Sequence, residues 1–515
     1  MRMGIIYSSA ETVSVWIGVP MVESDAPTLR EILLKLDWAR KNVRSRSLDS
    51  EWPVWSDDYY ARVVSQFFLK EWWRRTWVFQ EIVLAKSIRL HYGTVSVTWN
   101  ILNGAHLYFY YLSSKCAVFP IVVPVGVYEA MKRISIIKDV RYRRARGLGV
   151  RLTQLLYRDR LSFCSDPRDR IYALLGLAED QDSVSPDYTK PVQLVLQDTV
   201  EILVEKERSL NIICMLPKSR RMNGLPSWVP DFTTSSHSRD LMDFLLKEPD
   251  ECHVFMASGT MTFSGVHVEA GILSAKGLIL DIVDGMGSAT NVPQFNLLEK
   301  PTLQFLSGHT CLQQSTTDKS RYPTRDDLLH AIWNTLVSSR QNWYAKATSA
   351  SRTLYLTFKS VVIPKEKWPL KDIWNWDDLD EVRLFYAKNA MLKFAGRSFS
   401  DWVNIAMEVF ESNLDFSVDD ITEEIRDLPL QISSTLRDQR LLVTASGYIG
   451  FVPNETKRGD KICILYGMDV PVVLRKNQDG TYELIGPCYV HGVMEGELMN
   501  DMQNGVFEER VFDIA

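Results

Sequence analysis

The sequence predicts an α/β protein that continues into a helical region and ends in a small β-rich, barrel-like module. A short helical stretch near the start leads directly into an apolar strand, Val13 to Ile17. From Asp57 to Ala85, and again within 186–210, apolar residues recur every three or four positions, which is typical of helices. Residues 440–497 are instead short apolar runs separated by turns. Strands and helices followed by a run of short strands favour an α/β part and a separate β part.

The strand from Val13 to Ile17 is apolar enough to lie inside a sheet, where strands normally have a neighbour on each side. Nothing precedes it that could supply those neighbours. We therefore expect either that later segments pair with it or that upstream strands are missing from this chain.

A long helix is predicted from Asp57 to Ala85, with Asp57 and Asp58 as start signals. Residues 88–99 alternate between apolar and polar positions around Gly93-Thr94 and predict a hairpin. The basic stretch 141–151 is interpreted as a solvated loop or helix face rather than a nucleic-acid patch, because only Tyr142 could offer a base a stacking surface.

A capped helix is predicted near residue 166. Asp166 can cap it, Pro167 suits the first helical position, Asp169 lies in the first turn, and Gly176 marks the end. A second helix follows within 186–210, with its apolar stripe at Val192, Val195, Leu196, Thr199, Ile202 and Leu203. Residues 225–232 hold a tryptophan between two prolines and predict an anchored extended loop.

The middle of the chain is more polar. Residues 285–330 are irregular and predict a linker or surface insertion. Helices are expected at 328–340 and 381–412, with an acidic, aromatic loop at 371–381 between them. In the last part, Ser446-Gly447, 457–460 and Asp479-Gly480 are the expected turns between strands, which favours a small barrel or a packed sheet.

Composition limits the function classes. The 515 residues carry a net charge of -5, so the chain lacks the basic excess of a nucleic-acid-binding protein. The seven cysteines contain no CxxC pair, which favours reduced thiols in the cytoplasm over disulfides or a zinc site. The most apolar segment, 117–127, is short and interrupted by prolines, so we predict a buried loop or strand and no membrane span.

Three motifs occur together in order. MGIIYSSAETVSVWIG begins at Met3, RRTWVFQE ends at Glu81, and DPRDRIYALLGLA begins at Asp166. They resemble the "M..IY..A..V.VWLG", "R.W..QE" and "DPRD.IYALLGL" blocks of the fungal heterokaryon-incompatibility (HET) domain. PDYTKPV, LPSWVPDF and the final β-rich stretch also look like segments of such proteins. The order and spacing are more specific than any one motif.

The resemblance implies a fold and a domain layout. HET domains are thought to be distantly similar to TIR domains, so the expected fold is an incomplete TIR-like α/β core with added helices. The blocks resembling "Y.ALSY.WG" and "LWID..CINQ" that normally open the domain are not found, which predicts an N-terminally truncated domain or an incorrectly assigned gene start. The expected divisions are the remaining HET domain at 1–110, a helical extension at 111–275, a polar insertion at 276–385, a helical segment at 386–440, the β-rich module at 441–500 and a tail at 501–515.

The resemblance also implies function: non-self recognition leading to programmed cell death in fungi, as effector or regulator, in the cytoplasm and through protein partners by self-association or with other incompatibility proteins. Two alternatives stay open. The TIR analogy allows a glycohydrolase that splits NAD, with Glu81 stabilising an oxocarbenium-like transition state. An inactive remnant could instead serve as an interaction module.

Seven residues of the second and third motifs are candidate site residues, namely Arg75, Trp77, Gln80, Glu81, Asp166, Arg168 and Asp169. On a continuous helix, Trp73, Trp77, Gln80, Glu81 and Leu84 share one face, and Arg75 lies too far round to reach Glu81. Glu81 is therefore either a site acid or, as we favour, a structural ion-pair member.

For Asp166, Arg168 and Asp169, capping with a salt bridge is favoured over catalysis. His491, Glu495 and Glu497 have side chains that can ligate metals, but their spacing favours a turn with a hydrogen-bonded histidine. We predict no metal and no cofactor.

Overall fold

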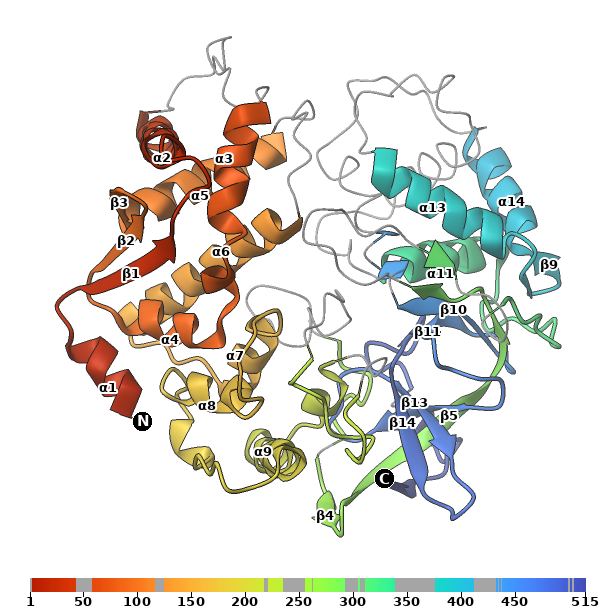
Figure 1. Ribbon diagram of the computed structural model, residues 1–515. Helices are drawn as coiled ribbons and strands as arrows, with labels where there is room; N and C mark the ends of the chain where they lie inside the picture. Colours follow the sequence, from red (N-terminus) through yellow and green to blue (C-terminus); the bar gives the residue numbers. More distant parts are fainter. Residues whose placement is uncertain are drawn as a thin grey trace. The chain divides into compact units, whose positions relative to one another are not determined.

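A small sheet with helices around it makes up the first part of the chain, and a larger sheet with its own helices makes up the last part (Figure 1). The computed structural model describes residues 2–42, 58–115, 125–216, 221–234, 255–291, 304–305, 311–338, 376–411 and 432–515, except 262, 434, 437, 499, 500 and 503. The chain divides into an N-terminal unit (1–192, 232–235 and 294–301) and a C-terminal unit (193–231, 236–293 and 302–515).

The sheet of the N-terminal unit has three strands. β1 (Val13–Gly18) pairs in parallel with β2 (Ile88–Tyr92), which pairs antiparallel with β3 (Val95–Thr98). The predicted strand and hairpin are therefore confirmed. Among the described residues β1 has a neighbour on one side only, and Trp16 is 59% exposed while Val15 and Ile17 are buried. We expected β1 to have a neighbouring strand on each side. The structure shows one neighbour, β2, which comes from a later segment of the chain.

Helices surround this sheet, and α2 packs against α5 and α4 against α8. Their bounds are α1 (Arg2–Ser9), α2 (Asp25–Asn42), α3 (Asp58–Phe68), the 3-10 helix η1 (Glu71–Arg74), α4 (Thr76–Leu84), α5 (Trp99–Lys115), α6 (Val125–Ala145), α7 (Leu152–Arg158) and α8 (Asp169–Leu175). The segment predicted as a buried loop or strand at 117–127 lies mostly outside the described residues, and Val125 to Val127 open α6.

The prediction of one helix from Asp57 to Ala85 is wrong. The chain breaks between α3 and η1 and again at Arg75, whose backbone is extended and bridges to Phe163. Consecutive residues on one α-helix point about 100° apart. The irregular turn allows both Trp72 and Trp73 to be buried, and the Trp73 indole donates to the Phe67 carbonyl at 2.9 Å.

The basic stretch at 141–151 is not wholly solvated. Arg144 and Arg146 are exposed, but Arg141 donates to the carbonyl oxygens of Ile82 and Ala85 at the end of α4. A cation at this position satisfies carbonyls that have no partner within the helix and complements the helix dipole. The stretch therefore also fixes α4 to α6.

The capped helix near residue 166 is confirmed but begins later, as α8. The Asp166 carboxylate accepts the amide of Arg168 at 3.0 Å, so it caps the turn that leads into the helix. Gly176 follows the last helical residue as predicted, although its φ of −67° is an ordinary helical value. The second helix is α9 (Val192–Glu207), and its buried positions include Val195, Leu196 and Leu203.

In the part of the C-terminal unit that the structure describes, nine strands form one sheet, which confirms a β-rich C-terminal part. Their bounds are β4 (His267–Glu269), β5 (Ile272–Met286), β10 (Gln439–Thr444), β11 (Ile449–Pro453), β12 (Lys461–Leu465), β13 (Val472–Lys476), β14 (Tyr482–Pro487), β15 (Tyr489–Val490) and β16 (Arg510–Ile514). The pairing order is β12-β13-β14-β16-β5-β10-β11-β15, and β12 also pairs with β5. The sheet thus takes β5 and β16 from outside residues 441–500.

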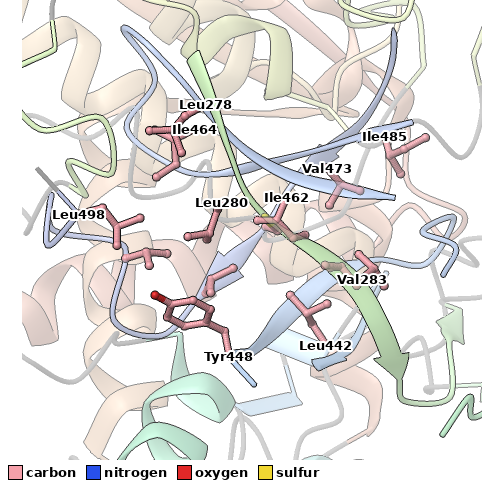
Figure 2. Packing of buried hydrophobic residues seen from close by; sticks show 14 of the residues in the cluster. Leu278, Leu280, Val283, Leu442, Tyr448, Ile462, Ile464, Val473, Ile485 and Leu498 are labelled. Carbon is pink, nitrogen blue, oxygen red and sulfur yellow. The ribbon is translucent and has the colours of Figure 1, made fainter. Parts of the chain in front are cut away.

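The long strand β5 organises this sheet, because it pairs with β4, β10, β12 and β16 along its length. A Cβ atom on Gly277 would come within 2.3 Å of the Ile464 carbonyl oxygen, so the close approach of β5 to β12 requires glycine there. Figure 2 shows the apolar core beneath, where Leu278 and Leu280 of β5 meet Ile462 and Ile464 of β12.

Three helices of this unit have the bounds α11 (Arg325–Val337), α13 (Trp376–Asn389) and α14 (Phe399–Glu411). The helix predicted at 328–340 is confirmed as α11, and Thr324 and Asp327 cap it reciprocally. The 371–381 loop is wrong from Trp376 onward, where α13 begins, and 371–375 lie outside the described residues. The 381–412 helix is interrupted by a small hairpin, β8 (Lys393–Phe394) and β9 (Arg397–Ser398), whose turn places Ala395 and Gly396 at positive φ.

Two further predictions concern residues of this unit. Trp228 anchors the loop at 225–232 as expected: it is fully buried, and its indole donates to the Gly271 carbonyl at 2.9 Å. Within the polar stretch at 285–330, β5 extends to Met286, and residues 315–317 are held by the Asp284 carboxylate, which accepts the Thr316 amide at 2.6 Å. Residues 292–303 and 306–310 lie outside the described part of the chain.

Candidate functional site

The motif residues occupy neighbouring positions on α1, α4, α8 and the loop at 186–190, all within the N-terminal unit. α4 packs against α1 on one side and against α8 on another. The structure therefore brings together the Trp-rich motif and the Asp-Pro-Arg-Asp motif. Trp77 and Asp169, which contact each other, are 92 positions apart in the sequence.

Asp169 is the centre of the contacts between α4 and α8. Its Oδ2 accepts the Trp77 indole N–H at 3.0 Å, and its Oδ1 accepts the Tyr188 hydroxyl at 2.6 Å. Burial and the bond to Asp169 raise the pKa of Tyr188 above its usual value. The ring of Tyr188 also meets Tyr172 of α8 edge to face, with centroids 5.1 Å apart. One carboxylate thus joins two helices and the following loop.

Asp166 and Arg168 form a bidentate pair at the start of α8. Arg168 Nε and Nη2 donate to the two Asp166 oxygens at 2.9 and 2.8 Å. The hydrogen bonds from Arg168 hold the pKa of Asp166 below its usual value. Arg168 Nη1 also donates to the carbonyls of Tyr188 and Lys190, the latter at 3.1 Å. The predicted salt bridge at the helix start is present, and it extends to the loop.

Glu81 interacts with Tyr7 of α1. Burial, the charge of Glu81 and a hydrogen bond to its carboxylate raise the pKa of Tyr7 to about 12, and Arg75 acts in the opposite direction. Arg75 is exposed and Glu81 half-buried. The prediction that Trp73, Arg75 and Glu81 belong to one helix is wrong, because Trp73 lies in η1 and Arg75 precedes α4. The charges of Arg75 and Glu81 both influence the pKa of Tyr7.

The Gln80 side chain packs where two glycines meet. It is 3% exposed, and its Nε2 would lie 2.2 Å from a Cβ atom on Gly176 and 3.6 Å from one on Gly4. A side chain at 176 would therefore require this buried amide to move. The glutamine thus packs against both α1 and the end of α8.

Comparisons with known proteins match both parts of the chain. Residues 1–81 match the family model "Heterokaryon incompatibility protein (HET)", and residues 416–507 match "Het-6 beta-barrel domain". The Neurospora crassa protein "Heterokaryon incompatibility protein 6, OR allele" is 25% identical over 386 residues, 67% of this chain. Both ends of the chain are therefore similar to fungal heterokaryon-incompatibility (HET) proteins. It spans about half the length of that relative, 50%, and no solved structure matches it.

The HET match ends at Glu81, the last residue of the second motif. Trp77 of that motif donates to Asp169 of α8, which lies beyond the matched range. The HET region and α8 therefore share one structural unit.

A buried ionic centre lies beneath α8, and sequence reasoning missed it. Asp159 is 4% exposed, and its oxygens lie 3.1 Å from Arg133 Nη1 and 3.5 Å from Arg170 Nη1. Ser162 also donates to it at 2.6 Å. Burial raises the pKa of Asp159, and the two arginines oppose this. The signal was in the sequence: Arg158, Asp159 and Arg160 directly follow an apolar helical run.

His491, Glu495 and Glu497 do not come together as metal ligands. His491 lies near Tyr489, with 3.2 Å between Nδ1 and the hydroxyl, and the amide of Glu495 donates to the Glu497 carboxylate at 2.7 Å. Within the described ranges, no group of three or more His, Cys, Asp or Glu side chains could hold a metal ion. Nor does the described part of the chain contain a helix with the length and apolarity needed to cross a membrane.

Proposed function

We propose that this HET-family chain acts in non-self recognition, as an effector of incompatibility-linked cell death or as a regulator of one. The observation that carries the proposal is the match of residues 1–81 to the HET family model; within that range, Trp77 of the last motif donates to Asp169 of α8. The name of the Neurospora crassa relative, a heterokaryon incompatibility protein, supports the same role. Protein partners, including other copies of the chain, and a cytoplasmic location belong to this proposal.

The contacts favour a structural task for the motif residues. Asp166, Arg168 and Asp169 hold a loop, and Glu81 holds α1, so these charged groups already have partners. We propose that the helices around the first sheet and the β1–β2 pair belong to a TIR-like α/β core. In this interpretation the motifs keep the unit in the shape that a partner recognises.

Controlled expression in a filamentous fungus tests the role. We expect growth arrest or death of hyphal compartments if the chain is an effector, or altered death after fusion of unlike strains if it is a regulator. An Asp169→Asn variant should weaken either effect, whereas Asp479→Asn, at an exposed turn of the C-terminal unit, should not. Normal growth and unchanged fusion outcomes at verified protein levels would contradict the proposal and favour an inactive interaction module.

The same purified protein tests the glycohydrolase alternative. Incubation with NAD and measurement of released nicotinamide should give no turnover above buffer if Glu81 is structural. Turnover that Glu81→Gln abolishes, with the fold intact by circular dichroism, would establish the catalytic interpretation instead.

A further inference from the structure

The C-terminal end of α6 and the turn after it form an exposed tip, residues 142–149. From Arg144 to Gly149 every residue is exposed. Gly147 has a positive φ of 72°, and a Cβ atom there would have open space around it. The Leu148 amide donates to the Arg143 carbonyl at 2.9 Å, so the backbone of the helix end fixes the turn. The tip is therefore a projection of defined shape.

Two apolar side chains lie on this tip, since Tyr142 is 51% exposed and Leu148 is 52% exposed. In a turn of this kind the residue after the glycine often packs back against the helix, but half of Leu148 remains uncovered. The Arg146 guanidinium lies 4.4 Å from the centroid of the Tyr142 ring and covers one of its faces. This contact disfavours the stacking of a nucleotide base on Tyr142 and leaves Leu148 available for an apolar partner.

Three arginines make this end of the helix positive. Arg144 and Arg146 are exposed, and neither forms an ion pair with a carboxylate of the described residues. Arg141, just before the tip, donates to the carbonyl oxygens of Ile82 and Ala85. These carbonyls are neutral groups, so the charge of Arg141 is retained.

The carboxylates near the tip do not cancel this charge. Asp139 is shared by two other arginines. Asp180 is 8% exposed and accepts the Leu152 amide at 2.8 Å. Glu179 is exposed beside the tip, where a Cβ atom on Gly149 would come within 1.7 Å of its Oε2. Setting Glu179 against the three arginines leaves two positive charges, in a chain whose net charge is -5.

We propose that this tip binds the surface of a membrane that contains anionic lipids, with Leu148 inserted among the lipid headgroups and the arginines on the lipid phosphates. A flat membrane surface suits an exposed tip because binding requires no pocket. Guanidinium groups match phosphate oxygens in charge and geometry, and anionic lipids attract basic residues that lie close to them. Arginines beside leucine and tyrosine are typical of segments that lie in the membrane interface. Few groups take part, so the contact is weak and reversible.

Co-sedimentation of the full chain with lipid vesicles tests the charged part of this site. We expect binding to vesicles of phosphatidylcholine with phosphatidylserine, no binding to phosphatidylcholine alone, and loss of binding at high salt. Arg144→Glu combined with Arg146→Glu should reduce binding at least about tenfold, since each basic residue contributes near the surface. The control pair Lys319→Glu and Arg325→Glu changes exposed residues of the C-terminal unit by the same net charge and should retain binding. Equal losses in the two pairs would show that net charge alone acts, and would overturn the proposal.

A second pair of variants tests the apolar part. Leu148→Ser should weaken binding to the phosphatidylserine vesicles several-fold, whereas Leu194→Ser, at a leucine of α9 that is 47% exposed, should leave it unchanged. The same effect of both variants would show that Leu148 is not inserted. Fluorescence polarisation with a labelled single-stranded RNA separates the other class of polyanion. Binding of the RNA without binding of the anionic vesicles would assign the tip to nucleic acid and overturn the proposal, as would the absence of vesicle binding by the wild type.

Discussion

Asp169 links the two motifs through hydrogen bonds of its carboxylate. Its carboxylate holds the Trp77 indole and the Tyr188 hydroxyl at once, so the aspartate orders α8, α4 and the following loop. The motif spacing marks these residues, but the sequence does not state that they contact each other. At this scale, the pairing of charged and aromatic groups explains why both motifs occur together in one unit.

The indole donor can be removed without emptying the site. We expect Trp77→Phe to lower the free energy of unfolding by about 1 kcal/mol, because Asp169 loses one charge-assisted bond at a half-buried position. Urea denaturation measures this loss. Trp16→Phe, at a side chain that is 59% exposed, should change stability by less than about 0.5 kcal/mol. Equal losses in the two variants would mean that the Asp169 bond contributes little.

Helix packing in the N-terminal unit depends on glycines at the contacts between helices as well as on the side chains that fill them. Gly4 of α1 and Gly176 at the end of α8 contact each other, and both lie against the Gln80 amide of α4. A Cβ atom on Gly4 would lie 3.6 Å from Gln80 Nε2, whereas a Cβ atom on Gly176 would lie only 2.2 Å from it. This difference offers a matched pair of tests at the scale of elements.

We expect Gly176→Ala to destabilise the protein by about 1–3 kcal/mol, because the new methyl group must displace a buried amide. Gly4→Ala should be neutral or stabilising, since the space is adequate and alanine favours a helix by up to about 1 kcal/mol. Thermal unfolding compares the two. Similar Tm values for both variants would show that Gln80 moves aside freely.

Across the whole molecule, each unit contains a histidine that is kept neutral: His106 is buried, and His491 is partly buried. Burial lowers the pKa of His106 in the N-terminal unit and of His491 in the C-terminal unit to about 4. His106 lies 3.3 Å from the Ser135 hydroxyl, and His491 lies beside His330, with ring centroids 5.9 Å apart, and near the hydroxyl of Tyr489. His330 adds to the lowering of the His491 pKa.

These histidines predict the acid response. Their folded pKa values are below the unfolded value of 6.5, so the unfolded chain binds more protons between pH 6.5 and about 4. The stability that they contribute is therefore complete above pH 6.5 and is lost as the pH falls through that window, by at most roughly 3 kcal/mol for each. Urea denaturation between pH 7 and 4 measures it. His491→Gln should flatten the dependence, and an unchanged slope would show that His491 is accessible to protons when folded.

Local signals predicted most elements, and nonlocal packing explains the errors. The hairpin at 88–99, the strand at 13–18 and the caps around Asp166 depend on neighbours in sequence, and the structure has them. The break at Arg75 depends on Phe163, which pairs with it from far along the chain. The site was predicted as residue types and motifs; their bonds, and the Asp159 centre, required knowledge of which helices meet.

The amino-acid sequence alone determined the family resemblance, the α/β class with its β-rich end, and the candidate residues from Arg75 to Asp169, since these depend on composition, period and spacing. Only the tertiary structure decided that Asp169 joins Trp77 to Tyr188 and that Glu81 meets Tyr7. The physical reason is that hydrogen bonds and charges act over a few ångströms of space, whatever the distance along the chain.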